Sequence, residues 1–166
     1  AAITGSRNKR TSRCGGVGIM QAGDIIFVKG RTPMSALIRL FDPGEFSHVA
    51  IAVSKTHILE AQYGTRTRIV PFRFKMEDCK IIDLGLPPKD RRTIETNSIY
   101  YVGKKYDYLQ AISYALKGCT YDSPNNHICT EIIHELLNLI GYMCCIQDMK
   151  PNQLYRYLTC DSLGGD

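Results

Sequence analysis

Short apolar runs separated by polar turns dominate the first half of the chain. The runs are rich in Val, Ile and Phe, and clusters of Gly, Pro, Asp and Ser lie between them. Such runs, bounded by turn-forming residues, are typical of β-strands. The pattern predicts strands over residues 25–29, 49–53, 58–61, 68–72 and 80–84.

In the second half, apolar residues recur at helical spacing instead. This spacing predicts a helix through Ile94 and Tyr101, a second over residues 109–116, a third that begins near Cys129 and a last one that begins at Pro151. A further short helix is predicted after the Thr32-Pro33 pair, because proline is favoured in a first helical turn. Strands followed by helices indicate an α+β fold.

Length and composition favour one globular domain. The chain has 166 residues, of which 44% are hydrophobic and 22% charged, which is ordinary for a domain that buries its own core. We expect residues 1–18 to form a flexible basic arm and residues 19–166 a single domain, to which the residues discussed below assign catalysis. No apolar stretch reaches the ~20 residues of a membrane span, so we expect a soluble domain without a transmembrane segment. The pattern leaves open whether it is cytoplasmic, periplasmic or virion-associated, and in which oligomeric state.

The net charge of +5 is concentrated near the start, where Arg7, Lys9, Arg10 and Arg13 occur within thirteen residues. Such an arm could contact nucleic acid, anionic lipid or an anionic cell-wall polymer, or could be a solvated tail. No stripe of basic and aromatic residues runs through the rest of the chain, so a specific nucleic-acid partner is not expected.

The seven cysteines do not form a recognisable framework. Their number is odd and no CxxC pair occurs, which disfavours both a disulfide scaffold and a zinc ribbon. Cys119, His127 and Cys129 could be drawn together as metal ligands, but a fourth ligand is missing. We therefore expect reduced thiols, no metal and no cofactor.

Cys129 differs from the other cysteines in its position. Polar residues precede it, and Thr130 and Glu131 separate it from the apolar stripe of its helix, so it lies near the helix start. Unsatisfied N–H groups and the helix dipole lower the pKa of a thiol there. His48, which leads into an apolar strand, is a candidate base for such a thiol. A buried structural cysteine is the alternative reading.

Several short segments occur in a specific order along most of the chain. They are Gly23-Asp24-Ile25-Ile26-Phe27, Ser47-His48-Val49-Ala50-Ile51, Ile58-Leu59-Glu60-Ala61, Thr67-Arg68-Ile69-Val70-Pro71-Phe72, Gly103-Lys104-Lys105-Tyr106-Asp107 and Cys129-Thr130-Glu131. In this order the chain resembles the circularly permuted NlpC-like cysteine hydrolases of the YiiX/YebB-like group. The resemblance implies a papain-like, circularly permuted α+β fold, with an antiparallel sheet or small barrel packed on helices and the nucleophile helix in the C-terminal half.

The resemblance also assigns catalytic roles. It makes Cys129 the nucleophile, His48 its base and Glu60 the residue that orients the imidazole. The physical reading agrees for Glu60, because a base needs a third group to fix its tautomer, and Glu60 ends a strand that could neighbour the one carrying His48. Two positions depart from the family pattern. Ile128 replaces an aromatic residue before the nucleophile, and Thr130 replaces a serine after it.

Four further residues are candidates for substrate binding. Tyr63 and Tyr106 could face the cleft, and Arg66 and Arg68 could attract the carboxylates of a substrate. All four have an alternative reading, as core tyrosines and as solvated charges at a strand edge.

The leading prediction is a cysteine hydrolase of amide bonds, acting on peptidoglycan or other cell-wall peptides through a thioester intermediate. The alternatives are an acyl-lipid hydrolase or acyltransferase, and a non-catalytic binding, virion or surface module that retains the fold.

Overall fold

A computed structural model of the protein describes residues 11–13, 20–31, 35, 39, 42–61, 65–106, 126–127, 129–142 and 149–160. At residues 11–13, 105–106, 126–127, 129 and 160 it describes the backbone and not the side chain. The predicted helix over residues 109–116, and most of the short one after Pro33, lie outside the described residues.

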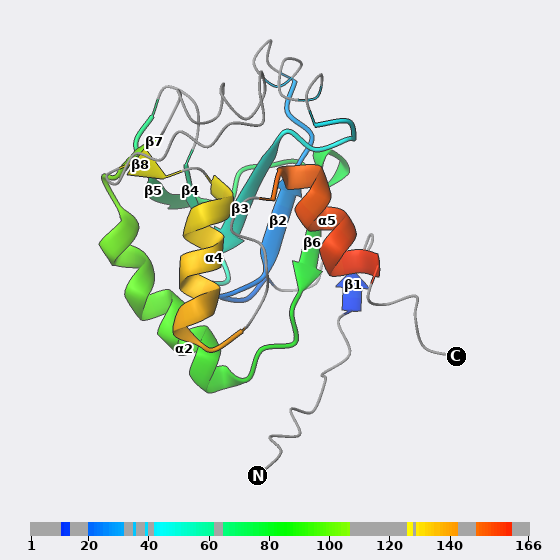
Figure 1. Ribbon diagram of the computed structural model, residues 1–166. Helices are drawn as coiled ribbons and strands as arrows, with labels where there is room; N and C mark the ends of the chain where they lie inside the picture. The colour runs from blue at the N-terminus through cyan, green and yellow to red at the C-terminus, as the bar shows by residue number, and fades with distance from the viewer. Residues whose placement is uncertain are drawn as a thin grey trace.

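A six-stranded antiparallel sheet forms the centre of the fold (Figure 1). Its strands are β1 (Thr11–Arg13), β2 (Ile25–Val28), β3 (His48–Ala52), β4 (His57–Glu60), β5 (Arg68–Pro71) and β6 (Cys79–Asp83). Their order across the sheet is β1-β6-β2-β3-β4-β5. The five strands predicted from the sequence all occur, each with its ends within one residue of the prediction.

Three short strands were not predicted. Strand β1 pairs with β6 at the edge of the sheet, so residues 11–13 of the expected basic arm contribute to the sheet. Strands β7 (Lys105–Tyr106) and β8 (Asn126–His127) pair in parallel apart from the main sheet. Strands of two or three residues are too short to produce a hydrophobic period.

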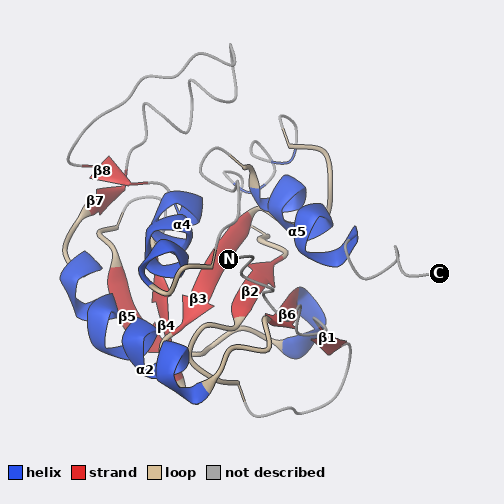
Figure 2. Ribbon diagram, turned by 60° about the horizontal axis from the view of Figure 1, so that its bottom comes forward, coloured by secondary structure: helices blue, strands red, loops and turns tan. Residues whose placement is uncertain are grey.

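The described helices are α2 (Pro88–Asn97), α4 (Cys129–Leu139) and α5 (Pro151–Cys160), with the 3₁₀ turns η1 (Met76–Asp78) and η2 (Ser98–Tyr101). Figure 1 and Figure 2 show α2, α4 and α5 on one face of the sheet. The predicted α+β class is therefore confirmed. None of the helices in the described part of the chain has the length and apolarity needed to cross a membrane.

The helix predicted through Ile94 and Tyr101 is divided into α2 and η2. At the junction the buried Ser98 donates a 2.6 Å hydrogen bond from Oγ to the carbonyl oxygen of Ile94. A hydroxyl that bonds back to the preceding turn competes with the helical pattern. The regular helix ends at this point.

Side chains on both faces of the sheet are buried. On the helix face, alternate strand residues contact the apolar stripes of α4 and α5; this cluster includes Ile25, Phe27, Val49, Ile51, Leu59, Ile132, Leu136, Leu154 and Leu158. The opposite face buries the remaining strand residues, which include Ile26, Val28, Ala50, Ala52 and Ile58, and Phe72 and Phe74 lie against them. Because both faces are covered, the strands have nearly continuous apolar sequences rather than an apolar–polar alternation.

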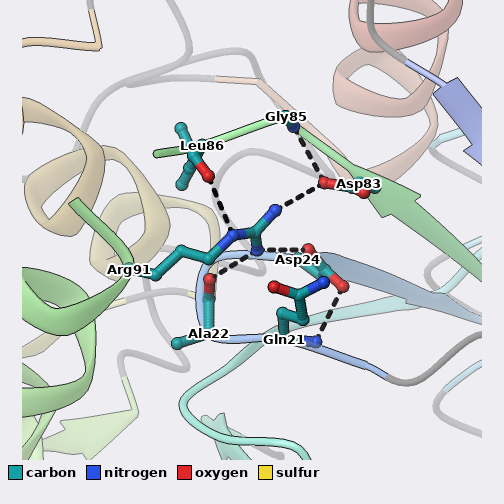
Figure 3. A network of polar contacts seen from close by, with 7 residues as sticks. All are labelled: Gln21, Ala22, Asp24, Asp83, Gly85, Leu86 and Arg91. Carbon is teal, nitrogen blue, oxygen red and sulfur yellow. Dashed lines mark hydrogen bonds and ion pairs between the residues drawn. The ribbon is translucent and has the colours of Figure 1, made fainter. Parts of the chain in front are cut away.

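Arg91 of α2 ties the start of β2 to the end of β6 (Figure 3). Its guanidinium donates to the carboxylates of Asp24 at 2.9 Å and Asp83 at 2.7 Å, and to the carbonyl oxygens of Ala22 and Leu86. Burial raises the pKa of Asp24, although its hydrogen bond from Arg91 acts in the opposite direction. This network fixes the end of the sheet at which β3 ends, away from His48.

Asn152, in the first turn of α5, holds the loop that leads into β3. Its amide oxygen accepts a hydrogen bond from the Phe46 N–H at 2.9 Å, and its amide nitrogen donates to the Phe46 carbonyl oxygen at 2.7 Å and to Asp42. The backbone N–H of Asn152 donates to the Asp42 carboxylate at 2.9 Å. This buried network fixes the backbone two residues before His48.

Candidate functional site

His48 is the first residue of β3 and lies opposite Val28 of β2. Alternate residues of a strand point to the same face of the sheet, so the His48 side chain lies on the same face as Ala50 and Ala52. That face is opposite the helices. Its imidazole ring meets the ring of Phe74 on that face, with 6.2 Å between the ring centroids. The side chain is largely buried, with 13% of its surface exposed.

Glu60 is the last residue of β4 and lies beside His48 on the same face. In the register of β3 and β4, Ala52 faces Ile58, which puts Glu60 opposite Ala50 and diagonal to His48. The Oε2 atom of Glu60 is 3.7 Å from the Nε2 atom of His48. This distance is within ion-pair range but longer than a hydrogen bond.

Two arginines bind the other oxygen of the same carboxylate. Arg68, which faces Glu60 across the β4–β5 ladder, donates to Oε1 from Nε at 3.1 Å and from Nη2 at 2.9 Å. Arg73, just after β5, donates to Oε1 from Nη2 at 2.6 Å. The Glu60 side chain is fully buried, whereas those of Arg68 and Arg73 are 41% and 42% exposed. The arginines thus supply a buried carboxylate with counter-charges from the solvent side.

These contacts keep Glu60 ionised. Burial alone would raise the pKa of the carboxyl, but the contacts with His48, Arg73 and Arg68 together outweigh burial and lower its pKa from 4.5 to about 2. A carboxylate that is ionised at neutral pH can orient an imidazole and stabilise its protonated form.

Cys129 is the first residue of α4, as predicted from the polar-to-apolar change in the sequence. Helix α4 contacts β3, and Figure 1 shows the start of α4 (yellow) at the end of the sheet where β3 begins. The apolar stripe of α4 covers the Val49 and Ile51 face, whereas His48 lies on the opposite face. A thiol at the start of α4 would therefore reach His48 only around the end of β3. The Cys129 side chain lies outside the described residues.

Thr130, the second residue of α4, is 1% exposed, and its Oγ1 atom has no hydrogen-bond partner among the described residues. Thr130 thus places a hydroxyl in a buried position next to the predicted nucleophile.

Of the predicted substrate-binding residues, the structure describes the side chains of the two arginines and not those of the two tyrosines. Arg66 is exposed and donates from Nη1 to the carbonyl oxygen of Gly103 at 2.9 Å, whereas Arg68 binds Glu60. Tyr106 belongs to β7, but its side chain lies outside the described residues, as does the whole of Tyr63. The structure therefore brings His48, Glu60 and Arg68 together and leaves the roles of the tyrosines as predictions.

Arg73 was not predicted as part of this cluster. The sequence does indicate that Glu60 needs a basic partner, because a glutamate buried within an apolar strand requires a counter-charge. Arg73 reaches Glu60 from beyond the end of β5, and no sequence period predicts that contact.

No group of three or more His, Cys, Asp or Glu side chains in the described part of the chain is arranged to hold a metal ion. Within the cluster, the carboxylate that could serve as a ligand already accepts three N–H groups from arginines.

Comparisons with known proteins support the fold. No protein-family model matches the chain. No curated protein matches it. Among solved structures, the chain is similar to the metalloprotein YiiX from Escherichia coli O157:H7, of the family DUF1105, with a TM-score of 0.57 and 19% sequence identity. The similarity covers 75% of this chain and 68% of YiiX. The chain therefore has a YiiX-like fold.

Proposed function

We propose that this protein is a cysteine hydrolase of amide bonds with a circularly permuted, papain-like arrangement, in which Cys129 is the nucleophile, His48 the base and Glu60 the orienting group. The observation that carries the proposal is the buried His48–Glu60 pair at the start of β3. Helix α4, which begins at Cys129, contacts the same strand. The YiiX-like fold agrees with the resemblance that first suggested these roles.

The reaction follows from the chemistry of these groups. The Cys129 thiolate attacks the amide carbonyl carbon, and the backbone N–H groups at the start of α4 stabilise the oxyanion. Imidazolium at His48 donates its proton to the leaving amine as the C–N bond breaks and a thioester forms. Neutral His48 then accepts a proton from water, which attacks the thioester and releases the acid and the Cys129 thiolate, so that the thiolate and the imidazolium are restored. Glu60 stays ionised throughout.

We propose peptides of the bacterial cell wall as substrates. Their stem peptides carry carboxylates, and the chain has a net charge of +5. Arg66, Arg68 and Arg73 gather positive charge around the end of β4 and the strand beside it, and a cationic site raises the local concentration of an anionic substrate.

YiiX is described as a metalloprotein, whereas the His48–Glu60 cluster of this chain does not suit a metal ion. Two guanidiniums occupy Glu60, and their positive charge opposes a cation beside His48. No step of the proposed mechanism involves a metal.

Labelling of the native protein with limiting iodoacetamide at neutral pH, followed by peptide mapping, tests the nucleophile. We expect Cys129 to react first. Cys79 provides a matched internal control, because it is buried and burial raises the pKa of its thiol. Preferential modification of Cys144, Cys145 or Cys160, with Cys129 unmodified, would contradict the assignment.

The acyl-lipid alternative has one structural observation in its favour. Ile99 and Tyr100 in η2, and Val102 just after it, are exposed, with Tyr100 at 75%, although Tyr101 between them is buried; such apolar side chains suit a lipid surface. Incubation with muropeptides and with a short-chain phospholipid, each analysed by mass spectrometry, separates the two classes. Amide cleavage of muropeptides supports our proposal, and release of fatty acid with intact muropeptides supports the alternative. Inertness toward both would favour a non-catalytic module.

A further inference from the structure

The two oxygens of the Glu60 carboxylate have different surroundings. All three arginine N–H contacts, two from Arg68 and one from Arg73, go to Oε1. Oε2 is buried, faces Nε2 of His48 at 3.7 Å and accepts no hydrogen bond from any described residue. The arginines therefore fix which oxygen faces the imidazole.

A buried carboxylate oxygen without a donor is costly, so it favours a proton on the atom that faces it. Here that atom is Nε2 of His48. A lone pair on Nε2 would instead point at the negative charge of Oε2. In a neutral imidazole with its proton on Nε2, Nδ1 carries the lone pair. The geometry thus selects one of the two tautomers.

We infer that Arg68 and Arg73 are positioning residues that hold Oε1 of Glu60, so that Oε2 keeps the proton of His48 on Nε2 and leaves Nδ1 as the nitrogen that exchanges protons in the proposed reaction. The catalytic value of this arrangement rests on the proposed function. The tautomer itself is a property of the His48–Glu60–arginine cluster and can be measured without turnover.

The charges around His48 give a second readout. Among the described residues these are Glu60 on β4, Arg68 on β5 and Arg73 on the segment after β5. Val28, opposite His48 on β2, is apolar, and Lys29 beyond it is paired with Glu45. The face of β3 toward α4 is apolar as well. One carboxylate thus faces two guanidiniums, and removing one guanidinium favours the imidazolium form.

Nitrogen-15 NMR of the histidine rings tests the tautomer directly. The chain has four histidines, and a His48→Gln variant identifies the His48 signals by their loss. The measurement uses the Cys129→Ala protein, so that ionisation of the thiol does not interfere. We expect neutral His48 to carry its proton on Nε2. A neutral His48 protonated on Nδ1 would overturn the inference, and this result needs no arginine variant to fold.

Arg73→Gln then tests the role of the arginine. We expect the pH at which His48 titrates to rise by about half a unit or more, because one nearby cation is lost. Arg73→Lys keeps the charge and should restore most of the original value. Arg92→Gln, at an exposed position on α2, is the matched control for loss of one positive charge. A shift in Arg73→Gln no larger than that in Arg92→Gln would refute the positioning role.

Activity assays separate this inference from the proposed function. These assays use protein that retains Cys129. There, Arg73→Gln should lower kcat and shift the pH dependence of kcat in parallel with the NMR titration, and Arg73→Lys should restore both. If Arg73 had only a structural role, Arg73→Gln would lower the melting temperature and leave the pH dependence of kcat unchanged. If the expected tautomer is found but the unaltered protein cleaves no amide, the proposed function fails while the assignment of the cluster stands.

Discussion

Glu60 and Arg68 face each other across the antiparallel strands β4 and β5, and two nitrogens of the arginine donate to one oxygen of the glutamate. This ion pair can form only in the register in which Glu60 and Arg68 are directly opposite each other. A shift of one residue between β4 and β5 would move Arg68 to the other face of the sheet and leave Glu60 without this donor. The charge pair therefore contributes to the register as well as to the site.

Stability should fall steeply in acid because of Glu60. Its pKa is about 2 in the folded protein, below its ordinary value of 4.5, so the unfolded chain binds the proton first as pH falls. The stabilisation is complete above about pH 5 and is lost as pH falls toward 2, amounting to about 3 kcal/mol at most. Urea unfolding between pH 7 and pH 2 measures it.

Glu60→Gln should be less stable than the original protein at pH 7 and should lose less stability on acidification. Glu77→Gln is the control, because Glu77 is exposed and its ion pair with Arg31 is long, at 3.8 Å. Equal acid dependence in the original protein and in Glu60→Gln would show that another group controls this transition.

Replacing the base should cost more activity than replacing its partner. His48→Ala removes proton transfer and should lower kcat about 10²–10⁴-fold. Glu60→Gln should do less damage, because the amide keeps the shape and can still accept a hydrogen bond. His57→Ala, at an exposed position at the start of the same strand as Glu60, should change little. Turnover assays with circular dichroism of each variant provide the test, and full activity in a folded His48→Ala would remove His48 from the mechanism.

The sequence predicted five of the six strands of the sheet, because each of these five is a largely apolar run bounded by turn-forming residues, whereas β1 is short and polar. It also predicted the start of α4 at Cys129, where polar residues change to an apolar stripe. The His48–Glu60 contact could be anticipated only as a possibility from neighbouring strands. What fixes it is the β3–β4 register, in which Glu60 lies diagonal to His48.

Other features depend on contacts that no local pattern encodes. Arg73 reaches Glu60 from outside any strand, and Asn152 binds Phe46 across 106 positions of the chain. The face on which His48 lies was also not predicted. Burial on both sides of the sheet hides the alternation that would have separated the helix face from its opposite.

Asn152→Ala should destabilise the protein strongly. The change removes the hydrogen bonds of a buried amide to Phe46 and Asp42 and leaves the Phe46 N–H, which these contacts satisfy, without its partner. Loss of such a buried network costs about 2–4 kcal/mol. Urea unfolding measures the loss, and Arg156→Ala, at an exposed position on the same helix, is the matched control.

The same variant should also disturb the site, because Phe46 lies two residues before His48. In Asn152→Ala, the His48 ring signals should move, whereas those of His134 on α4 should not. Unchanged His48 signals in a folded but destabilised variant would confine the role of Asn152 to stability.

Arg91→Leu should be among the most damaging single changes outside the site. It leaves the carboxylate of Asp24, whose side chain is 5% exposed, without its guanidinium, and it frees the carbonyl oxygens of Ala22 and Leu86 from their donor. Removing one partner of a buried ion pair costs about 3–5 kcal/mol. For a chain of this size that is a fall of roughly 10 °C in melting temperature.

A double variant separates the charge from the packing in this prediction. Arg91→Leu removes the guanidinium from both Asp24 and Asp83, and Asp24→Asn then removes the more deeply buried of these two charges. The double variant should therefore recover part of the stability that Arg91→Leu loses. Arg92→Leu, on the exposed side of the same helix, should change stability by less than about 0.5 kcal/mol. Thermal unfolding of the four proteins at pH 7 decides the matter. If the double variant is no more stable than Arg91→Leu, the cost comes from lost packing and from the unpaired carbonyl groups rather than from the buried charge of Asp24.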